Sequence, residues 1–227
     1  MVDDDADRPE VLARADGVLG EVVLRRRPGP IYELILNGVF LMDTQETTTE
    51  RLLAETVLTR LADPRRVLVA GLGLGCTLAA LLADPRPRRV EVVEIEPLLV
   101  EWLRAGLVPG AGTALADPRV RVTVADVREL LRDLNDQRYD AVVLDVDNGP
   151  MFLVHDRNAA VYEPATLRDA AGTLRPGGLL VVWSSGPAPE LHATMSAQVG
   201  PTEQLVRWVE REGRELDYYL YLATRAR

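Results

Sequence analysis

Five short apolar runs alternate with helical patterns in the middle of the chain, and this alternation constrains the fold more than any other feature. The runs are rich in β-branched residues, and three are nearly continuous apolar stretches, as buried parallel strands are. They cover 66–70, 89–96, 119–126, 139–146 and 178–185. Apolar residues at helical spacing separate most of them, at 76–83, 97–105, 127–134 and 164–174. This order predicts an α/β fold with a doubly wound, mostly parallel sheet.

The segment before this alternation resembles a small antiparallel sheet. Short β-type runs cover 20–27, 31–36 and 39–42. The pair Asn37-Gly38 lies between the last two runs and suits a two-residue hairpin turn, because both central positions of that turn need positive φ. We therefore expect a β-meander here.

Apolar residues at helical spacing also cover 50–61, between the β-type runs and the first parallel strand. At the other end of the α/β alternation, runs at 203–210 and 215–225 predict a closing antiparallel hairpin. No repeat or linker interrupts the chain. We expect three segments: a flexible, charged lead-in over 1–16, a β-hairpin or meander over 17–48 and one α/β domain over 49–227.

Charge and cysteine content argue against several kinds of site. The net charge of −9 over 227 residues argues against nucleic-acid binding, which needs a basic surface. The run Arg25-Arg26-Arg27 is interpreted as a solvated turn rather than an anion site. The single cysteine, Cys76, allows no internal disulfide and no cysteine-based zinc site, and we expect no metal. No apolar run reaches the roughly 18 residues of a membrane span and the start is acidic, so we expect a cytoplasmic protein without membrane contact.

Three glycines mark the end of the first parallel strand. Gly71, Gly73 and Gly75 alternate with other residues just before a helical pattern. Glycine has no Cβ, so the backbone there can come close to a ligand, although a tight strand-to-helix turn alone gives the same pattern. The spacing differs from the G-x-G-x-x-G of pyrophosphate sites, which favours a nucleoside without phosphates over NAD or FAD.

Acidic residues end the next three strands. Glu94 lies about 20 residues after the glycines, where a carboxylate can accept from ribose hydroxyls, and Asp126 and Asp145 end the following strands. Carboxyl ends of parallel strands meet at one edge of a sheet. Each acid alone fits helix capping equally well. Together with the glycine turn, the three acids favour a nucleoside site.

Several blocks of the sequence resemble class I S-adenosylmethionine-dependent transferases, and more narrowly their spermidine synthase-like branch. The resemblance covers residues 31 to about 185. Its most specific blocks are "DPRV", "VADVREL" and "YDAVVLD", and "LNGVFLMDTQ" also resembles that branch. The resemblance implies a Rossmann-like, seven-stranded sheet, S-adenosylmethionine or its decarboxylated form as cofactor, no metal, a small-molecule acceptor and a homodimer.

The resemblance also assigns roles in a cofactor site. Gly71, Gly73 and Gly75 would pack against the adenosine and the amino-acid tail. Glu94 would hold the ribose hydroxyls, and Ile95 would lie against the adenine.

Further roles follow from the same resemblance. Asp126 would accept from the adenine amino group, and the Val127 N–H would donate to the ring. Gln45 would face the nucleoside from the N-terminal hairpin. Asp145 would help to deprotonate an attacking amine.

This sequence departs from the branch near the acceptor. Leu74 stands where spermidine synthases carry an aspartate that grips the donor ammonium, so a donor that keeps its carboxylate should be better tolerated. Asp147, which we expect to take part in catalysis with Asp145, follows it by two residues rather than the three of the branch. Threonines at 47–49 replace an acidic, tyrosine-bearing stretch. A polyamine needs a carboxylate for each buried ammonium, so polyamine specificity is expected to be lost.

Several other residues have side chains that could contact a substrate or exchange a proton. His155, in the loop after the fourth strand, is a candidate general base or an exposed side chain. Tyr162 is a candidate substrate contact or a packing residue, and Trp183 either walls the acceptor pocket or covers the sheet. Cys76 is expected to be a small buried filler. His192 receives no role.

The favoured hypothesis is methyl transfer from S-adenosylmethionine to a small molecule bound between Asp145, Asp147 and the 151–162 loop. In-line attack at the carbon bonded to sulfur depends mainly on alignment. The first alternative is aminopropyl transfer from the decarboxylated donor. The second is a non-catalytic, dimeric nucleoside-binding protein.

Overall fold

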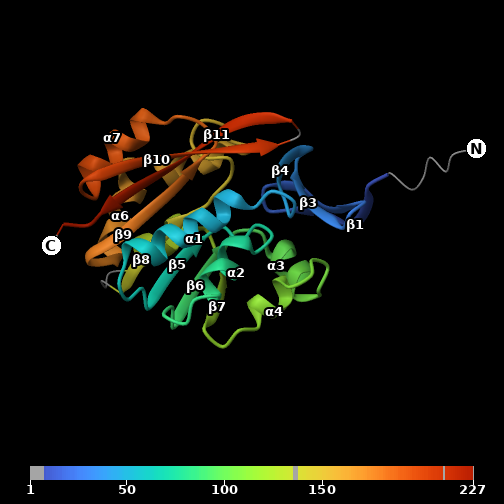
Figure 1. Ribbon diagram of the computed structural model, residues 1–227, viewed down its shortest axis with the longest axis horizontal. Helices are drawn as coiled ribbons and strands as arrows, with labels where there is room; N and C mark the ends of the chain where they lie inside the picture. Colours follow the sequence, from blue (N-terminus) through green and yellow to red (C-terminus); the bar gives the residue numbers. More distant parts are fainter. Residues whose placement is uncertain (1–7, 135–137, 212, 227) are drawn as a thin grey trace, which may run out of the picture.

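The computed structural model describes residues 8–134, 138–211 and 213–226, which form two sheets with helices (Figure 1). The smaller sheet is antiparallel in the order β1-β2-β3-β4. Its strands are β1 (Glu10–Gly17), β2 (Gly20–Arg27), β3 (Ile31–Leu36) and β4 (Val39–Asp43). The larger sheet has the order β10-β11-β9-β8-β5-β6-β7. Its strands are β5 (Arg66–Ala70), β6 (Arg89–Glu94), β7 (Val120–Val124), β8 (Tyr139–Leu144), β9 (Leu174–Ser184), β10 (Thr202–Arg211) and β11 (Arg214–Thr224).

Helices cover both faces of the larger sheet. Successive side chains of a strand point to opposite faces, and in β5 Val67 and Val69 belong to one core whereas Leu68 and Ala70 belong to the other. The first core contains α1 (Thr48–Arg60), α2 (Cys76–Leu82), α3 (Pro97–Arg104), α4 (Ala111–Leu115) and the inner face of the smaller sheet. The second contains α5 (Val127–Asp133), the 3-10 helix η1 (Asp156–Tyr162), α6 (Pro164–Thr173) and α7 (Pro189–Gln198). A doubly wound sheet is confirmed.

The predicted order of strands and helices is also confirmed. The parallel strands pair in register, for example Val69 with Val92 and with Val143. The closing hairpin forms as β10 and β11, which run antiparallel. Asn37 and Gly38 have φ of 51° and 76°, as the predicted hairpin turn requires.

Two predictions about the N-terminal region are wrong. The lead-in predicted over 1–16 contains strand β1 from Glu10 onward, which pairs with β2; residues 1–7 lie outside the described residues. The three arginines at 25–27 lie within β2 rather than in a turn. They form ion pairs, Arg26 with Glu10 and the other two with Glu33, which is why three cations are tolerated in one strand.

The strand order places the carboxyl ends of β5, β6, β7 and β8 at one edge of the sheet. The chain passes from β5 to β6 on one side, whereas β8 pairs with the other side of β5. Ligands of open α/β sheets bind at such a switch point. The smaller sheet lies beside this edge, near β11, α2 and α3 (Figure 1).

Two contacts fix the smaller sheet to the domain. The Glu96 carboxylate accepts from the Val18 amide at 2.7 Å. Arg211, at the end of β10, donates to the Asp43 carboxylate at 2.7 Å, and its guanidinium lies 4.4 Å from the Phe40 ring centroid. These contacts hold the turn after β1 and the end of β4 against the larger domain. In the described part of the chain, no helix is long and apolar enough to cross a membrane.

Replacing Arg211 with alanine is expected to lower the free energy of unfolding by about 1–3 kcal/mol, because the buried Asp43 carboxylate loses a partner. Arg60→Ala is the matched control, since its ion pair with Glu203 of the same strand is exposed and should contribute less than about 0.5 kcal/mol. Urea denaturation of both variants measures the difference. Equal losses would mean that the Arg211 contact does not join the two parts.

Candidate functional site

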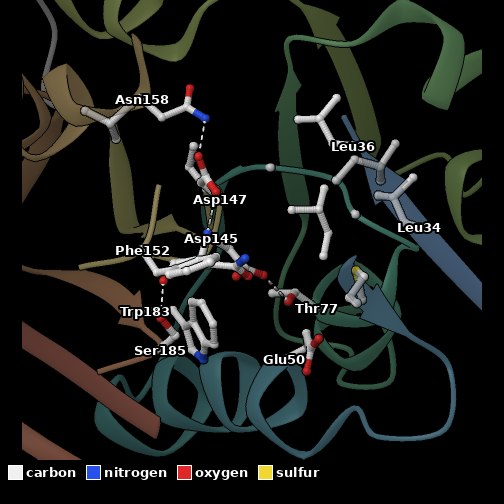
Figure 2. Close-up of a pocket in the computed structure, with 18 of the residues that line it drawn as sticks. Leu34, Leu36, Glu50, Thr77, Asp145, Asp147, Phe152, Asn158, Trp183 and Ser185 are labelled. Atoms are coloured by element: carbon white, nitrogen blue, oxygen red, sulfur yellow. Dashed lines mark hydrogen bonds between the residues drawn. The ribbon is translucent and has the colours of Figure 1, made fainter. Parts of the chain in front are cut away.

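A cavity of about 980 Å³ lies at the sheet edge, between the ends of β5, β6 and β8 and the smaller sheet (Figure 2). One wall is apolar, with Leu34 and Leu36 of β3 and Leu41 and Met42 of β4. Leu34 and Leu36 are drawn across the cavity from the acidic side chains in Figure 2. An apolar wall facing polar groups suits a ligand with an aromatic base and a polar tail.

The glycine turn after β5 lies close to other backbone, and two of its glycines line the cavity. Gly71 and Gly73 have φ of 94° and 50°. A Cβ on Gly71 would lie 2.0 Å from the Asp145 carbonyl oxygen, and one on Gly73 would lie 2.6 Å from the Met42 sulfur. Backbone therefore excludes a side chain at Gly71, and the positive φ together with the Met42 side chain disfavours one at Gly73. Gly75 is buried outside the cavity lining, at the N-cap of α2 with φ of 85°.

Glu94 holds this turn in place. Its carboxylate accepts from the Leu72 amide at 2.8 Å and from the Glu96 amide at 2.9 Å, and the residue is only 7% exposed. Burial raises the pKa of Glu94, and the two amides oppose that rise. Glu94 lines the cavity at the end of β6, so a ribose could reach the same carboxylate.

Asp126, Val127 and Ile95 also line the cavity. Asp126 caps α5 by accepting from the Arg128 amide at 2.9 Å, and the Arg128 guanidinium lowers the pKa of that carboxyl. The hydrogen bonds of Asp126 are therefore those of a helix cap. Because Asp126 also lines the cavity, its carboxylate could still accept a hydrogen bond from an adenine. Ile95 and Val127 supply apolar surface beside it.

Asp145 ends β8 next to the glycine turn. The Thr77 hydroxyl donates to its carboxylate at 3.0 Å. Burial, with the nearby charge of Glu50, raises the pKa of Asp145 to about 7. A carboxyl with this pKa exists in both protonation states near neutral pH, which suits a group that accepts a proton.

Asp147 organises the loop after β8. It has a φ of 58°, and its carboxylate accepts from the amides of Val154 and His155 and from the Asn158 side chain at 2.7 Å (Figure 2). Asp147 lines the cavity, but these donors occupy its oxygens. Its contacts favour holding the loop over the catalytic role that the sequence suggested.

Besides Gly75, three predicted residues do not line the cavity. Gln45 is exposed. His155 caps η1, where its ring nitrogen accepts from the Arg157 amide at 3.2 Å. The Tyr162 hydroxyl is buried and donates to the Val146 carbonyl, so the packing interpretation fits Tyr162 better than substrate contact.

Trp183 does line the cavity, and its indole nitrogen is buried without a hydrogen-bond partner among the described residues. Cys76 also lines it; burial raises the pKa of its thiol to about 12, so it remains a thiol. The described residues contain no group of three or more potential metal ligands.

The structure revises the sequence-based view of the acceptor region. Leu74 belongs to the core and does not line the cavity; its amide lies 3.2 Å from the Met42 sulfur. Glu46 and Glu50, which flank the threonines at 47–49, both line the cavity. The acidic surface expected to be lost is thus partly supplied by α1 and the residues before it. The apolar spacing at 50–61 predicts a helix that includes Glu50, but it does not predict that the Glu50 side chain lines the cavity.

Replacing Asp145 with asparagine is expected to stabilise the fold, and more so at pH 8 than at pH 5. The raised pKa of Asp145 means that the folded state loses stability as pH rises from the ordinary value near 4 through about 7. Asparagine removes that loss and keeps an acceptor for Thr77. The gain should differ by about 1–3 kcal/mol between the two pH values in urea denaturation. A gain independent of pH would contradict a raised pKa.

Comparison with known proteins agrees with this geometry. The family model of the spermine/spermidine synthase domain matches residues 46–206. A solved structure described as spermidine synthase in complex with the transition state analogue AdoDATO superposes with a TM-score of 0.82 over 96% of this chain and 74% of that one, at 16% identity. That likeness shows a shared fold.

Curated relatives include enzymes of two kinds. A spermine synthase of Arabidopsis thaliana is 26% identical over 78% of this chain and 45% of its own. A polyamine aminopropyltransferase 2 of Pseudomonas aeruginosa is 32% identical over 66% of this chain and 42% of its own. A putrescine N-methyltransferase 2 of Nicotiana tabacum is 28% identical over 60% and 36%. This chain spans less than half the length of these relatives. It belongs to the spermine/spermidine synthase domain family, whose members are transferases on the class I S-adenosylmethionine-methyltransferase-like fold.

Proposed function

We propose that this chain transfers an aminopropyl group from decarboxylated S-adenosylmethionine to a small amine. The observation that carries the proposal is Asp145, a buried carboxyl with a pKa near 7 beside the glycine turn. An amine must lose a proton when it forms a new bond to carbon, and Asp145 is placed to accept it. The similarity to spermine synthase and to polyamine aminopropyltransferase supports the same reaction.

The cavity fits such a donor. Gly71 and Gly73 leave the backbone open on one side, and Glu94 and Asp126 offer carboxylates at neighbouring strand ends. Leu34 on the apolar wall, and Ile95 and Val127 beside Asp126, offer apolar surface for an adenine. The donor supplies a carbon activated by its bond to a positively charged sulfur.

The residues of the chain would then orient the acceptor and manage one proton. The acceptor nitrogen attacks that carbon as the carbon–sulfur bond breaks, and the thioether leaves with the bonding electrons. The proton displaced from nitrogen passes to the Asp145 carboxylate. The Thr77 hydrogen bond fixes the carboxylate orientation, and alignment supplies much of the rate enhancement.

Methyl transfer remains a second candidate, because putrescine N-methyltransferase is among the relatives. The first argument for it was the leucine at position 74. The placement of the Leu74 side chain in the core weakens that argument. The acidic residues Glu46 and Glu50 on the cavity favour a cationic acceptor in either reaction.

Decarboxylated S-adenosylmethionine with putrescine is expected to give methylthioadenosine, whereas ordinary S-adenosylmethionine should give little product. Asp145→Asn should lower kcat by about 100-fold or more, because it removes the proton acceptor, while the affinity for methylthioadenosine stays within about threefold. Chromatographic detection of the products and calorimetry measure the two effects. Methylated putrescine as the main product would establish methyl transfer instead. Binding of both donors without turnover of a broad amine set would favour a non-catalytic binding protein.

A further inference from the structure

Glu50 is an acidic side chain at the cavity for which the reaction described above has no use. It lies in the first turn of α1, and its carboxylate accepts from the Thr49 hydroxyl at 2.9 Å. Burial is the largest cause that raises the pKa of Glu50, and Glu46 adds to the rise while Arg211 opposes it. A carboxylate kept in such a position costs stability unless a cation compensates it.

Glu50 and Asp145 face the same part of the cavity from different elements. Thr77 of α2 donates to Asp145, and Glu50 of α1 lies beyond Thr77 in Figure 2. Each contributes to the cavity lining, and the charge of Glu50 is the second cause of the raised pKa of Asp145. Two like charges in a poorly solvated space repel each other, and a cation between them removes that repulsion.

Aromatic surface completes this part of the cavity. Trp183 and Phe152 lie on the Asp145 side in Figure 2, and the Trp183 ring lies 5.5 Å from the Tyr218 ring between centroids, tilted by 36°. All three line the cavity. Faces of aromatic rings attract an ammonium group, and their edges exclude water from it.

We propose that Glu50 is a specificity-determining residue that binds the ammonium group of the acceptor together with Asp145. Glu50 holds the positive charge of the incoming primary ammonium, Asp145 accepts one of its protons, and the nitrogen lone pair freed in this way attacks the carbon bonded to sulfur. The inference rests on the proposed amine acceptor and adds the residue that selects it. Neutral acceptors, such as alcohols or thiols, would leave the two carboxylates uncompensated.

Glu50→Gln is expected to weaken putrescine binding by about tenfold or more in calorimetry with methylthioadenosine already bound, because one of two carboxylates loses its charge. The affinity for methylthioadenosine alone should stay within about threefold. Turnover should show a raised KM for the amine and a smaller change in kcat. Glu55→Gln is the matched control, because Glu55 lies on the same helix and is exposed. Glu50→Asp should restore part of the affinity.

The pH dependence gives a readout that a merely structural role would not produce. The titratable groups facing Asp145 are Glu50 of α1, Cys76 of α2 and Tyr162 of η1. Putrescine binding to the unaltered protein should strengthen as pH rises through about 7, since Asp145 ionises there while the amine stays charged. In Glu50→Gln the midpoint should move to lower pH, because a like charge is gone.

Three outcomes overturn the inference. Putrescine affinity that is unchanged in Glu50→Gln removes Glu50 from the acceptor site, even if methylthioadenosine still binds and the proposed reaction stands. If Glu50→Gln and Glu55→Gln lose the same amount of putrescine affinity, the effect comes from the overall charge of α1 and not from a contact of Glu50. Failure of the unaltered protein to bind methylthioadenosine overturns the proposed function itself, and the role of Glu50 with it.

Discussion

The carbonyl oxygen of Asp145 lies 2.0 Å from the point that a Cβ would occupy at Gly71, and this close approach brings the first and fourth parallel strands to a common corner. A side chain at that position would push the turn away from β8. The Asp145 amide bonds to the Ala70 carbonyl at 2.9 Å, so the backbone of Asp145 is held on both sides. The carboxylate thereby gains a fixed place beside the cavity, with Thr77 as its donor.

The acids around the cavity serve the fold and the site together. Glu94 accepts from two amides of the turns that it lies between, Asp126 caps α5 and Asp147 orders the loop after β8. Each of these carboxylates accepts hydrogen bonds from donors elsewhere in the chain, which fixes its orientation. Asp145 differs, since one hydroxyl is its hydrogen-bond donor within the described part of the chain. The group with the fewest protein partners is the one best placed to exchange a proton.

The order of strands and helices could be predicted from the sequence, because period-2 and helical spacing are local properties. The positions of the acids at 94, 126 and 145 could also be predicted, because each follows a predicted strand and the carboxyl ends of parallel strands meet at one edge of a sheet. Glu50 was missed because it is 95 residues from Asp145 and its position depends on how α1 packs on the sheet. Gln45 was expected to face the nucleoside but is exposed. The direction of a side chain between β4 and α1 also depends on how α1 packs on the sheet.

Loop residues were the least predictable. His155 and Tyr162 lie in a segment whose path depends on Asp147 and on a positive φ at that residue, which no spacing rule anticipates. Strand β1 was missed because its charged residues suggested a solvated segment, whereas Glu10 pairs with Arg26 across the strands. Pairing between neighbouring strands thus overrode the composition of each one.

The contact between Arg211 and Asp43 spans 168 positions of the chain. On the ribosome, the strands of the smaller sheet are translated well before β10, which carries the arginine that secures them. The cavity is therefore completed only after β10 and β11 have been translated, because both contribute to its lining. A chain that stopped before β10 would leave the buried Asp43 carboxylate without Arg211 and the smaller sheet without this attachment to the domain.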